Sequence, residues 1–158
     1  MDNQKNIDKI TNEFVNNLVF QGATYASITI FKNGKLELYN STNAFWDEFY
    51  HENNYAKDCH LVKTGNNLIK SNNKFTILWD LIIPDSEIAN IINEYRIKNN
   101  LCHGISFVQK NPDGTMQGIN LTGKYSDLSF TKAVIENKKQ ILEEFNKIKL
   151  SYDLQNFK

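Results

Sequence analysis

The sequence carries no excess of charge of either sign. Its 18 lysine and arginine residues balance its 18 aspartate and glutamate residues, and Arg96 is the single arginine. A protein that binds nucleic acid on its own usually gathers a basic excess on one face and reads guanine or grips phosphate with arginine forks. The composition therefore argues against direct nucleic-acid binding by this chain.

Long hydrophobic runs are also missing. The most apolar stretch, residues 76–83, is short and is interrupted by Asp80, whereas a membrane-spanning helix needs about 20 apolar residues. The first six residues are polar and lack the apolar core of a secretory signal. We therefore expect a cytoplasmic protein with no membrane partner, and its 158 residues suit one domain.

Cysteine is scarce, and the common enzyme motifs are missing. Cys59 and Cys102 are too few for a disulfide framework, so we expect reduced thiols. Each precedes a histidine, but zinc loops separate their ligands by about two to four residues, so we expect no metal and no cofactor. The chain has no glycine-rich nucleotide loop, nucleophile elbow or zincin motif. We expect no catalytic residues, and a cysteine that meets a histidine in space is the enzymatic alternative.

Apolar periodicity predicts the order helix, hairpin, helix, short strand, helix, hairpin, helix. The expected helices cover residues 4–19, 43–54, 84–99 and 130–150, with a further short helix and a polar loop in 59–73. The expected strands cover residues 25–31, 35–39, 75–79, 103–108 and 116–121. In the helix at 84–99, the expected buried positions are Ile88, Ile91, Ile92 and Tyr95. Asn33-Gly34 is the strongest hairpin signal, and local hairpins require antiparallel pairing.

We therefore predict an α+β fold in which a five-stranded antiparallel sheet carries helices on its faces. The domain is expected to span residues 1–150, followed by a C-terminal tail at 151–158.

Aromatic residues gather in the middle third of the chain. Phe45 and Phe49 lie one helical turn apart, and we expect both in the hydrophobic core. Trp46, Tyr50 and Trp79 each combine a large apolar body with one polar tip that needs a partner when buried. These three side chains therefore suit a pocket for a ligand with an apolar and a polar part.

Several short motifs follow one another along the chain in a recognisable order. They are Phe45-Trp46-Asp47-Glu48-Phe49-Tyr50, Cys59-His60-Leu61-Val62, Trp79, Leu101-Cys102-His103-Gly104-Ile105-Ser106 and Asp113-Gly114-Thr115-Met116-Gln117-Gly118. This set resembles the autoinducer-binding domain of LuxR-type quorum-sensing regulators over nearly the whole chain. The resemblance implies an α/β/α sandwich of PAS/GAF-like type, with the ligand between the sheet and the helices on one face.

The resemblance also implies roles for individual residues. Trp46 matches the tryptophan whose indole N–H bonds the lactone carbonyl of an acyl-homoserine lactone, and Tyr50 matches the tyrosine that walls the ligand. Trp79 matches the tryptophan that packs on the lactone ring, and Gly104 matches the strand glycine near that ring. We also count Asn120 among the candidate ligand-binding residues.

Other positions depart from the family pattern. Cys59 stands where the family has the aspartate that accepts the ligand's amide N–H, and His60 replaces the proline that follows. A thiol is a weak acceptor, so that bond, worth roughly 1.5–3 kcal/mol, is lost. Asp58 could take this role if the loop is one residue shorter. Thr42 replaces the tyrosine that bonds the acyl carbonyl and is a shorter donor.

The sequence therefore predicts a small-molecule sensor domain for an acyl-homoserine lactone or a related amphipathic signal. The family continues into a helix-turn-helix domain, so transcription would be controlled through a DNA-binding partner or domain outside these 158 residues. The alternative is a sensor-only module that heterodimerises with a full-length regulator and inhibits it. Its contact surface would be the exposed face of the helix at 130–150 and the aromatics of 151–158; in either case we expect a homodimer or heterodimer.

Overall fold

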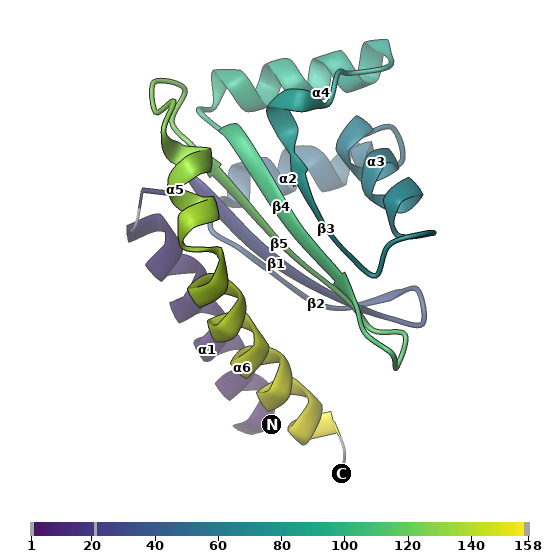
Figure 1. The fold of residues 1–158 in the computed structure, drawn as a ribbon, viewed down its shortest axis with the longest axis vertical. Helices are drawn as coiled ribbons and strands as arrows, with labels where there is room; N and C mark the ends of the chain where they lie inside the picture. The colour runs from purple at the N-terminus through teal and green to yellow at the C-terminus, as the bar shows by residue number, and fades with distance from the viewer. Residues whose placement is uncertain (1, 21, 157–158) are drawn as a thin grey trace.

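A five-stranded antiparallel sheet forms the centre of the computed structural model, which describes residues 2–20 and 22–156 (Figure 1). The strand order is β2-β1-β5-β4-β3. The strands are β1 (Tyr25–Lys32), β2 (Lys35–Ser41), β3 (Lys74–Leu78), β4 (Cys102–Lys110) and β5 (Met116–Gly123). Every neighbouring pair is antiparallel, which confirms the predicted sheet.

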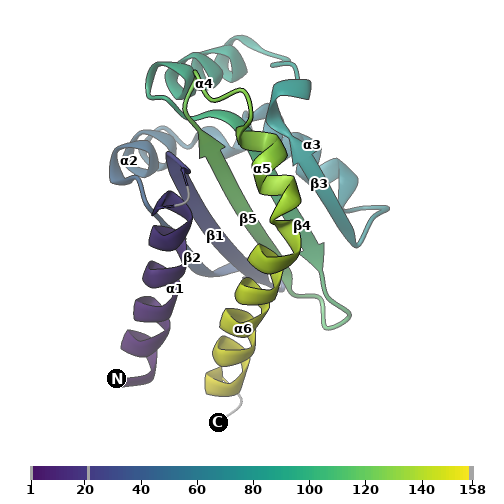
Figure 2. The ribbon, with the colours of Figure 1, turned by 60° about the vertical axis from the view of Figure 1, so that its left-hand side comes forward.

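Helices cover both faces of this sheet (Figures 1 and 2). One layer contains α1 (Asp2–Phe20), α5 (Phe130–Glu136) and α6 (Lys138–Asn156). The other contains α2 (Ala44–Glu52), α3 (His60–Leu68) and α4 (Glu87–Lys98), with the short 3-10 turns η1 (Tyr55–Lys57) and η2 (Trp79–Leu81). The arrangement is the predicted α+β sandwich, and none of the described helices is long and apolar enough to span a bilayer.

Turn chemistry and helix caps set the element boundaries. Asn33 and Gly34 both have positive φ, 52° and 74°, as a tight hairpin turn between β1 and β2 requires. Asn43 caps α2 by accepting from the Trp46 N–H at 2.9 Å, and Ser86 caps α4 in the same way. α2 and α4 therefore each begin directly after a residue whose side chain caps the helix.

The last helical segment differs from the single helix predicted at 130–150. Asn137 ends α5 because its side-chain amide donates to the Ala133 carbonyl at 2.8 Å, which competes with a continuing helix. After this break α6 runs through Asn156, so residues 151–156 continue the helix. Tyr152 is buried and donates to Glu37 at 3.1 Å, whereas Phe157 lies outside the described residues.

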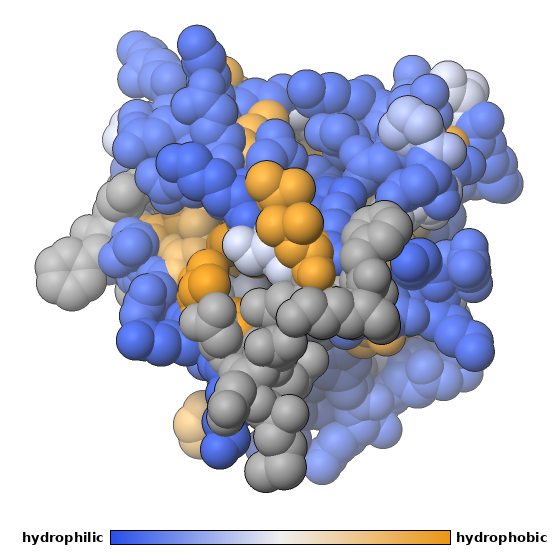
Figure 3. Space-filling view, turned by 90° about the horizontal axis from the view of Figure 1, so that it is seen from below, coloured by the Kyte–Doolittle hydropathy of each residue, from blue (hydrophilic) through white to orange (hydrophobic). Residues whose placement is uncertain are grey.

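Two hydrophobic cores lie on opposite sides of the sheet. The core against α1, α5 and α6 is mainly aliphatic, and its fully buried strand residues include Ile28, Ile30, Ile105 and Ile119. The core against α2, α3 and α4 is mainly aromatic. Seen from the end where α1 starts and α6 stops, the surface is mostly hydrophilic with a small hydrophobic group near its middle (Figure 3).

Two predictions about buried side chains are wrong. Ile88 and Ile91 are 39% and 44% exposed, whereas Ile92 and Arg96 face inward on α4. The predicted apolar stripe of α4 is wider than the face that the helix buries, so Ile88 and Ile91 lie at its edges and are partly exposed. Phe45 is 79% exposed because α2 turns Trp46, not Phe45, toward the sheet.

Phe45 and Phe49 should therefore respond very differently to truncation. Phe49 stacks on Tyr95 with ring centroids 3.6 Å apart and planes inclined by 7°, so Phe49→Ala should cost about 2 kcal/mol of unfolding free energy. Phe45→Ala, one turn away on the same helix, should change it by less than about 0.5 kcal/mol. Urea denaturation of both variants checks this, and equal losses would contradict the orientation of α2.

Candidate functional site

The candidate site is the aromatic cluster between the sheet and α2, α3 and α4. Its members are Tyr25, Trp46, Phe49, Tyr50, Tyr55, Phe75, Trp79 and Tyr95. Both tryptophans of the chain belong to it. The structure thus brings together the three side chains, Trp46, Tyr50 and Trp79, that the sequence predicts to line a pocket.

Trp46 occupies the middle of the cluster. Its ring lies 5.1 Å from that of Tyr50 and 6.1 Å from that of Tyr95. Its side chain is also a hydrogen-bond neighbour of the Tyr25 hydroxyl on β1, whose pKa is raised by burial to about 12. Trp46 therefore joins α2, α4 and the sheet, and its polar tip lies among hydroxyl groups.

A half-buried carboxylate links α2 to the edge strand of the sheet. Asp47 accepts hydrogen bonds from the hydroxyls of Tyr39 and Ser41, both on β2. Tyr39 in turn lies 3.3 Å from the hydroxyl of Tyr25. Burial and these neighbours raise the pKa of Tyr39 above its ordinary range, so it stays a protonated donor to Asp47. This network fixes the helix that carries Trp46.

Trp79 lies flat against the backbone of β4. The register of β4 is irregular between Cys102 and Ile105, and a Cβ at Gly104 would overlap the Trp79 ring. The indole N–H donates to the Ser106 hydroxyl at 2.8 Å. Gly104 lies against the tryptophan ring, because only a residue without a side chain leaves room for the ring; its predicted place near a ligand ring stays a prediction.

A row of hydrogen-bonded polar side chains crosses the sheet beneath the cluster. The Ser106 hydroxyl donates to Asn120 Oδ1 at 2.6 Å, and the Asn120 Nδ2 donates to the Ser27 hydroxyl at 3.1 Å. Strand register explains the row, since Asn120 pairs with Ser27 of β1 on one side and with Ser106 of β4 on the other. The floor of the site is thus polar at its centre, unlike the aliphatic opposite face.

The remaining predicted residues lie at different distances from this centre. Cys59 is buried and is a hydrogen-bond neighbour of the Tyr50 hydroxyl, whose pKa is raised mainly by burial. Thr42 accepts from the Ala26 N–H at 3.0 Å and so serves the pairing of β1 and β2. Asp58 ends η1, and among the described residues its side chain forms no hydrogen bond with the cluster. Their roles toward a ligand stay predictions.

Arg96 is the charged group of the site. It is 3% exposed, and its guanidinium lies 5.0 Å from the Trp79 ring and 5.9 Å from the Trp46 ring. Its Nε and Nη2 atoms are buried without a hydrogen-bond partner in the described part of the chain. Burial lowers its pKa, but a guanidinium keeps its proton in proteins. The cluster therefore encloses a positive charge.

His60, at the start of α3, is a second buried polar group, and its Nδ1 has no partner among residues 2–20 and 22–156. Burial and the charge of Arg96 lower its pKa to about 4. Its imidazole is therefore neutral near pH 7.

His60 should make the folded domain sensitive to acid. Its pKa of about 4 lies below the ordinary 6.5, so the folded state binds this proton less tightly than the unfolded chain does. The stability that depends on this group is fully present above pH 6.5 and is lost as the pH falls toward 4. His60→Gln should flatten this part of the profile in urea unfolding at several pH values. His51→Gln, the matched change at an exposed position, should not flatten the profile. If the dependence of unfolding free energy on pH is unaltered in H60Q, the role given to His60 is wrong.

Neither Cys59-His60 nor Cys102-His103 forms a cysteine–histidine hydrogen bond in the described part of the chain. His103 Nδ1 contacts Asp80 at 2.7 Å and its Nε2 contacts the Tyr125 carbonyl at 2.9 Å. These two contacts raise its pKa. Within the described ranges, no three His, Cys, Asp or Glu side chains are grouped as metal ligands, and neither cysteine hydrogen-bonds to a histidine.

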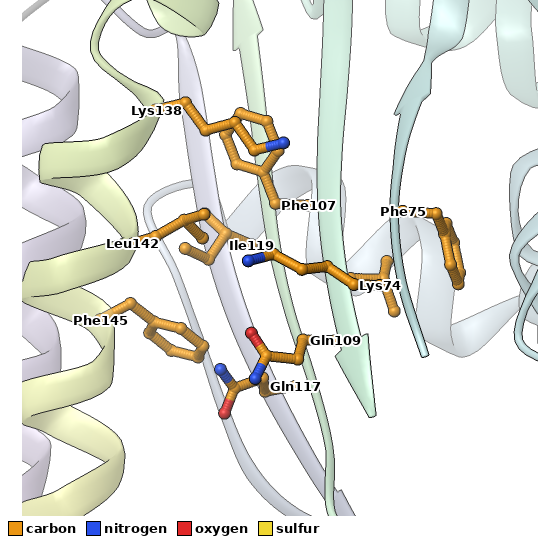
Figure 4. Close-up of a pocket in the computed structure, with 10 residues that line it drawn as sticks. Lys74, Phe75, Phe107, Gln109, Gln117, Ile119, Lys138, Leu142 and Phe145 are labelled. Atoms are coloured by element: carbon orange, nitrogen blue, oxygen red, sulfur yellow. The ribbon is translucent and has the colours of Figure 1, made fainter. Parts of the chain in front are cut away.

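Two small hollows lie on the other side of the sheet. The first, beneath Lys138 and Leu142 of α6, has a volume of about 10 Å³ (Figure 4), which is room for about one water molecule. The second lies between α1 and α5 and measures about 60 Å³. A small-molecule pocket usually needs roughly 300 Å³ or more. Figure 4 shows Phe75 pointing away from α6, and Phe75 packs with the core against α2, α3 and α4.

Sequence reasoning missed Arg96, Asp47 and the serines of the polar row. Arg96 stands out in the sequence as the only arginine among 18 basic residues. In a chain that otherwise uses lysine, a single arginine indicates a position where the planar guanidinium group matters. The serines carry no such signal, because their alignment in one row depends on the register of three strands.

No protein-family model and no curated protein sequence matches this chain. Solved structures, however, share its fold at low sequence identity. CepR2 from Burkholderia cenocepacia, an N-acylhomoserine lactone-dependent LuxR-family transcription factor, aligns with a TM-score of 0.62 and 10% identity over 83% of this chain and 77% of its own. The LBD domain of VqsR from Pseudomonas aeruginosa aligns with a TM-score of 0.59 and 11% identity over 93% of this chain and 94% of its own.

SdiA of Escherichia coli has also been solved, in one case in complex with octanoyl-rac-glycerol. That complex aligns with a TM-score of 0.63 and 11% identity, over 95% of this chain but only 60% of SdiA. The chain therefore has the fold of LuxR-type autoinducer-binding domains, as its motifs predict, and spans little more than half of SdiA.

Proposed function

We propose that this chain is a signal-sensing domain of LuxR type that binds an amphipathic small molecule among the residues of the aromatic cluster. The observation that carries the proposal is the placement of both tryptophans, with Tyr50 and the polar row, on one face of a sheet with this fold. Aromatic walls above a few convergent polar groups are typical of small-molecule sites. The two buried free cysteines suit a reducing compartment such as the cytoplasm.

The rings of the cluster pack on one another, with centroids 5.1 Å apart for Trp46 and Tyr50 and 3.6 Å apart for Phe49 and Tyr95, so we expect ligand binding to require their movement. Aromatic rings and Arg96 lie in the core between α4 and the sheet. A ligand that replaces these contacts would reorder α2 and α4. In this proposal the reordering changes how the domain meets a DNA-binding partner or domain, which controls transcription.

Thermal unfolding with a panel of amphiphiles tests this function. The panel contains acyl-homoserine lactones of several chain lengths, octanoyl-glycerol and alkanoic acids. A ligand that binds only the folded state should stabilise it by about 2.7 kcal/mol at a free concentration of 100 Kd. Trp46→Leu should weaken the response, whereas the change of exposed Phe45 to Leu should not. An unchanged melting temperature for every amphiphile would overturn the proposal.

A second candidate function is a docking module that pairs with a regulator. Leu150 and Leu154 lie one turn apart on α6 and are both exposed, and exposed apolar groups of this kind mark contact surfaces when they are contiguous. Tyr152, between them in sequence, is buried and does not extend this surface. Sedimentation of the wild type and of L150E/L154E, each alone and with a candidate regulator, tests this role. If both proteins sediment as monomers and neither binds the regulator, the role is excluded.

A further inference from the structure

Arg96 carries a buried charge for which the described chain supplies no counter-ion. None of the ion pairs among the described residues includes it. The groups whose charge would act on it are Cys59, Tyr50 and Tyr25, and none of them is a carboxylate. Burial raises the pKa of both tyrosines, so they are neutral near pH 7. A buried charge is costly unless it is paired.

The two unpartnered nitrogens of Arg96 indicate which acceptor group would fit beside them. Nε and Nη2 lie on one edge of the planar guanidinium, and their N–H groups form a parallel fork. A carboxylate accepts such a fork through two parallel hydrogen bonds. The rings of Trp46 and Trp79 lie near the same guanidinium. An apolar group bound beside the carboxylate would therefore contact aromatic surface.

Resting on the sensing function proposed above, we propose that the site takes an amphipathic carboxylic acid, whose carboxylate pairs with the free edge of Arg96 and whose apolar chain packs in the aromatic cluster. The neutral imidazole of His60, with its buried Nδ1 unpartnered in the described residues, offers one more polar contact on the same side. A neutral headgroup such as a lactone would leave the Arg96 charge unpaired.

Entry of the acid requires the side chains of the site to move. Neither of the two hollows lies between Arg96 and the tryptophans, since both are on the opposite side of the sheet. The Phe49–Tyr95 stack joins α2 to α4 through two side chains. Displacement of the Phe49 and Tyr95 rings would make room for an alkyl chain while the Arg96 guanidinium stays beside its anion.

Matched headgroups on one alkyl chain test the inference. Decanoate, methyl decanoate, decanoyl-glycerol, decanoyl-homoserine lactone and decyl sulfate are compared by calorimetry and thermal shift, below micelle-forming concentrations. For the wild type we expect decanoate to bind at least about tenfold more tightly than the methyl ester, as a charge-assisted pair implies. Arg96→Met should remove that preference, and Arg96→Lys, which keeps the charge but loses the fork, should lower it.

The outcomes separate this inference from the proposed function. Tight binding of the neutral amphiphiles with no preference for decanoate would overturn the acid assignment and leave a sensing domain. A preference for decanoate that survives in R96M, or stronger binding of decyl sulfate than of decanoate, would also overturn it. Binding of none of the compounds would overturn both. A preference for decanoate that is lost in R96M supports it, and Lys98→Met, an exposed cation on the same helix, should leave it intact.

Discussion

Gly104→Ala should cost the domain about 3 kcal/mol or more of unfolding free energy, because overpacking a closed site forces backbone or ring displacement. The added methyl group would overlap the six-membered part of the Trp79 indole. That ring cannot simply rotate away, since its N–H bond to Ser106 holds it from one side and Arg96 lies over it. Relief therefore requires loss of the hydrogen bond or distortion of β4.

Gly65→Ala is the matched control for this prediction. A Cβ at Gly65 would lie 3.7 Å from Ile77, an ordinary contact. Because Gly65 is inside α3, alanine should be neutral or should stabilise the helix by up to about 1 kcal/mol. Urea unfolding followed by tryptophan fluorescence reports both stability and the environment of Trp79. If G104A unfolds like the wild type with unchanged emission, the close approach of Trp79 to β4 is wrong.

Arg96→Met should have the opposite sign and make the ligand-free domain more stable. Burial of an unpaired ion costs several kcal/mol, and the two cation–π contacts, each worth about 0.5–2 kcal/mol, offset only part of that cost. Methionine has a similar length and adapts to irregular space. We expect a gain of about 1–3 kcal/mol in unfolding free energy, measured by urea denaturation.

The reason for this gain is specific to the position of Arg96. Lys98→Met, two residues further along α4 at an exposed position, should change stability by less than about 0.5 kcal/mol. Arg96→Lys keeps a buried charge and should give no gain. A loss of stability in R96M larger than that in R96K would mean that the guanidinium is already satisfied in the free protein.

The sheet was predictable because its signals are local. Asn33-Gly34 predicts a tight turn with positive φ, and both residues have positive φ in the structure. The alternation of apolar and polar residues on either side indicates which face of the sheet each strand residue occupies. The contact of Trp79 with Gly104 was not predicted, because the motifs placed both residues near a ligand ring and the steric need for a glycine under the indole depends on the tertiary fold.

Burial on the helices of the aromatic side was less predictable. On α2 the neighbours Phe45 and Trp46 are equally apolar by pattern, and only the docking of Asp47 on β2 decides which of them points inward. On α4 the inward position belongs to a charged residue, which apolar periodicity assigns to solvent. Its burial depends on rings from α2 and η2, which are distant in sequence.

The central claim, that a ligand binds among the residues of the aromatic cluster, is tested most directly by the indole N–H signals in a proton–nitrogen NMR spectrum. The chain has two tryptophans, both in the cluster, so these signals report on the site alone. Titration with decanoate, and with octanoyl-glycerol as the neutral comparison, should shift both signals in proportion to occupancy for whichever compound binds. Saturable binding that leaves both indole signals in place would contradict the claim.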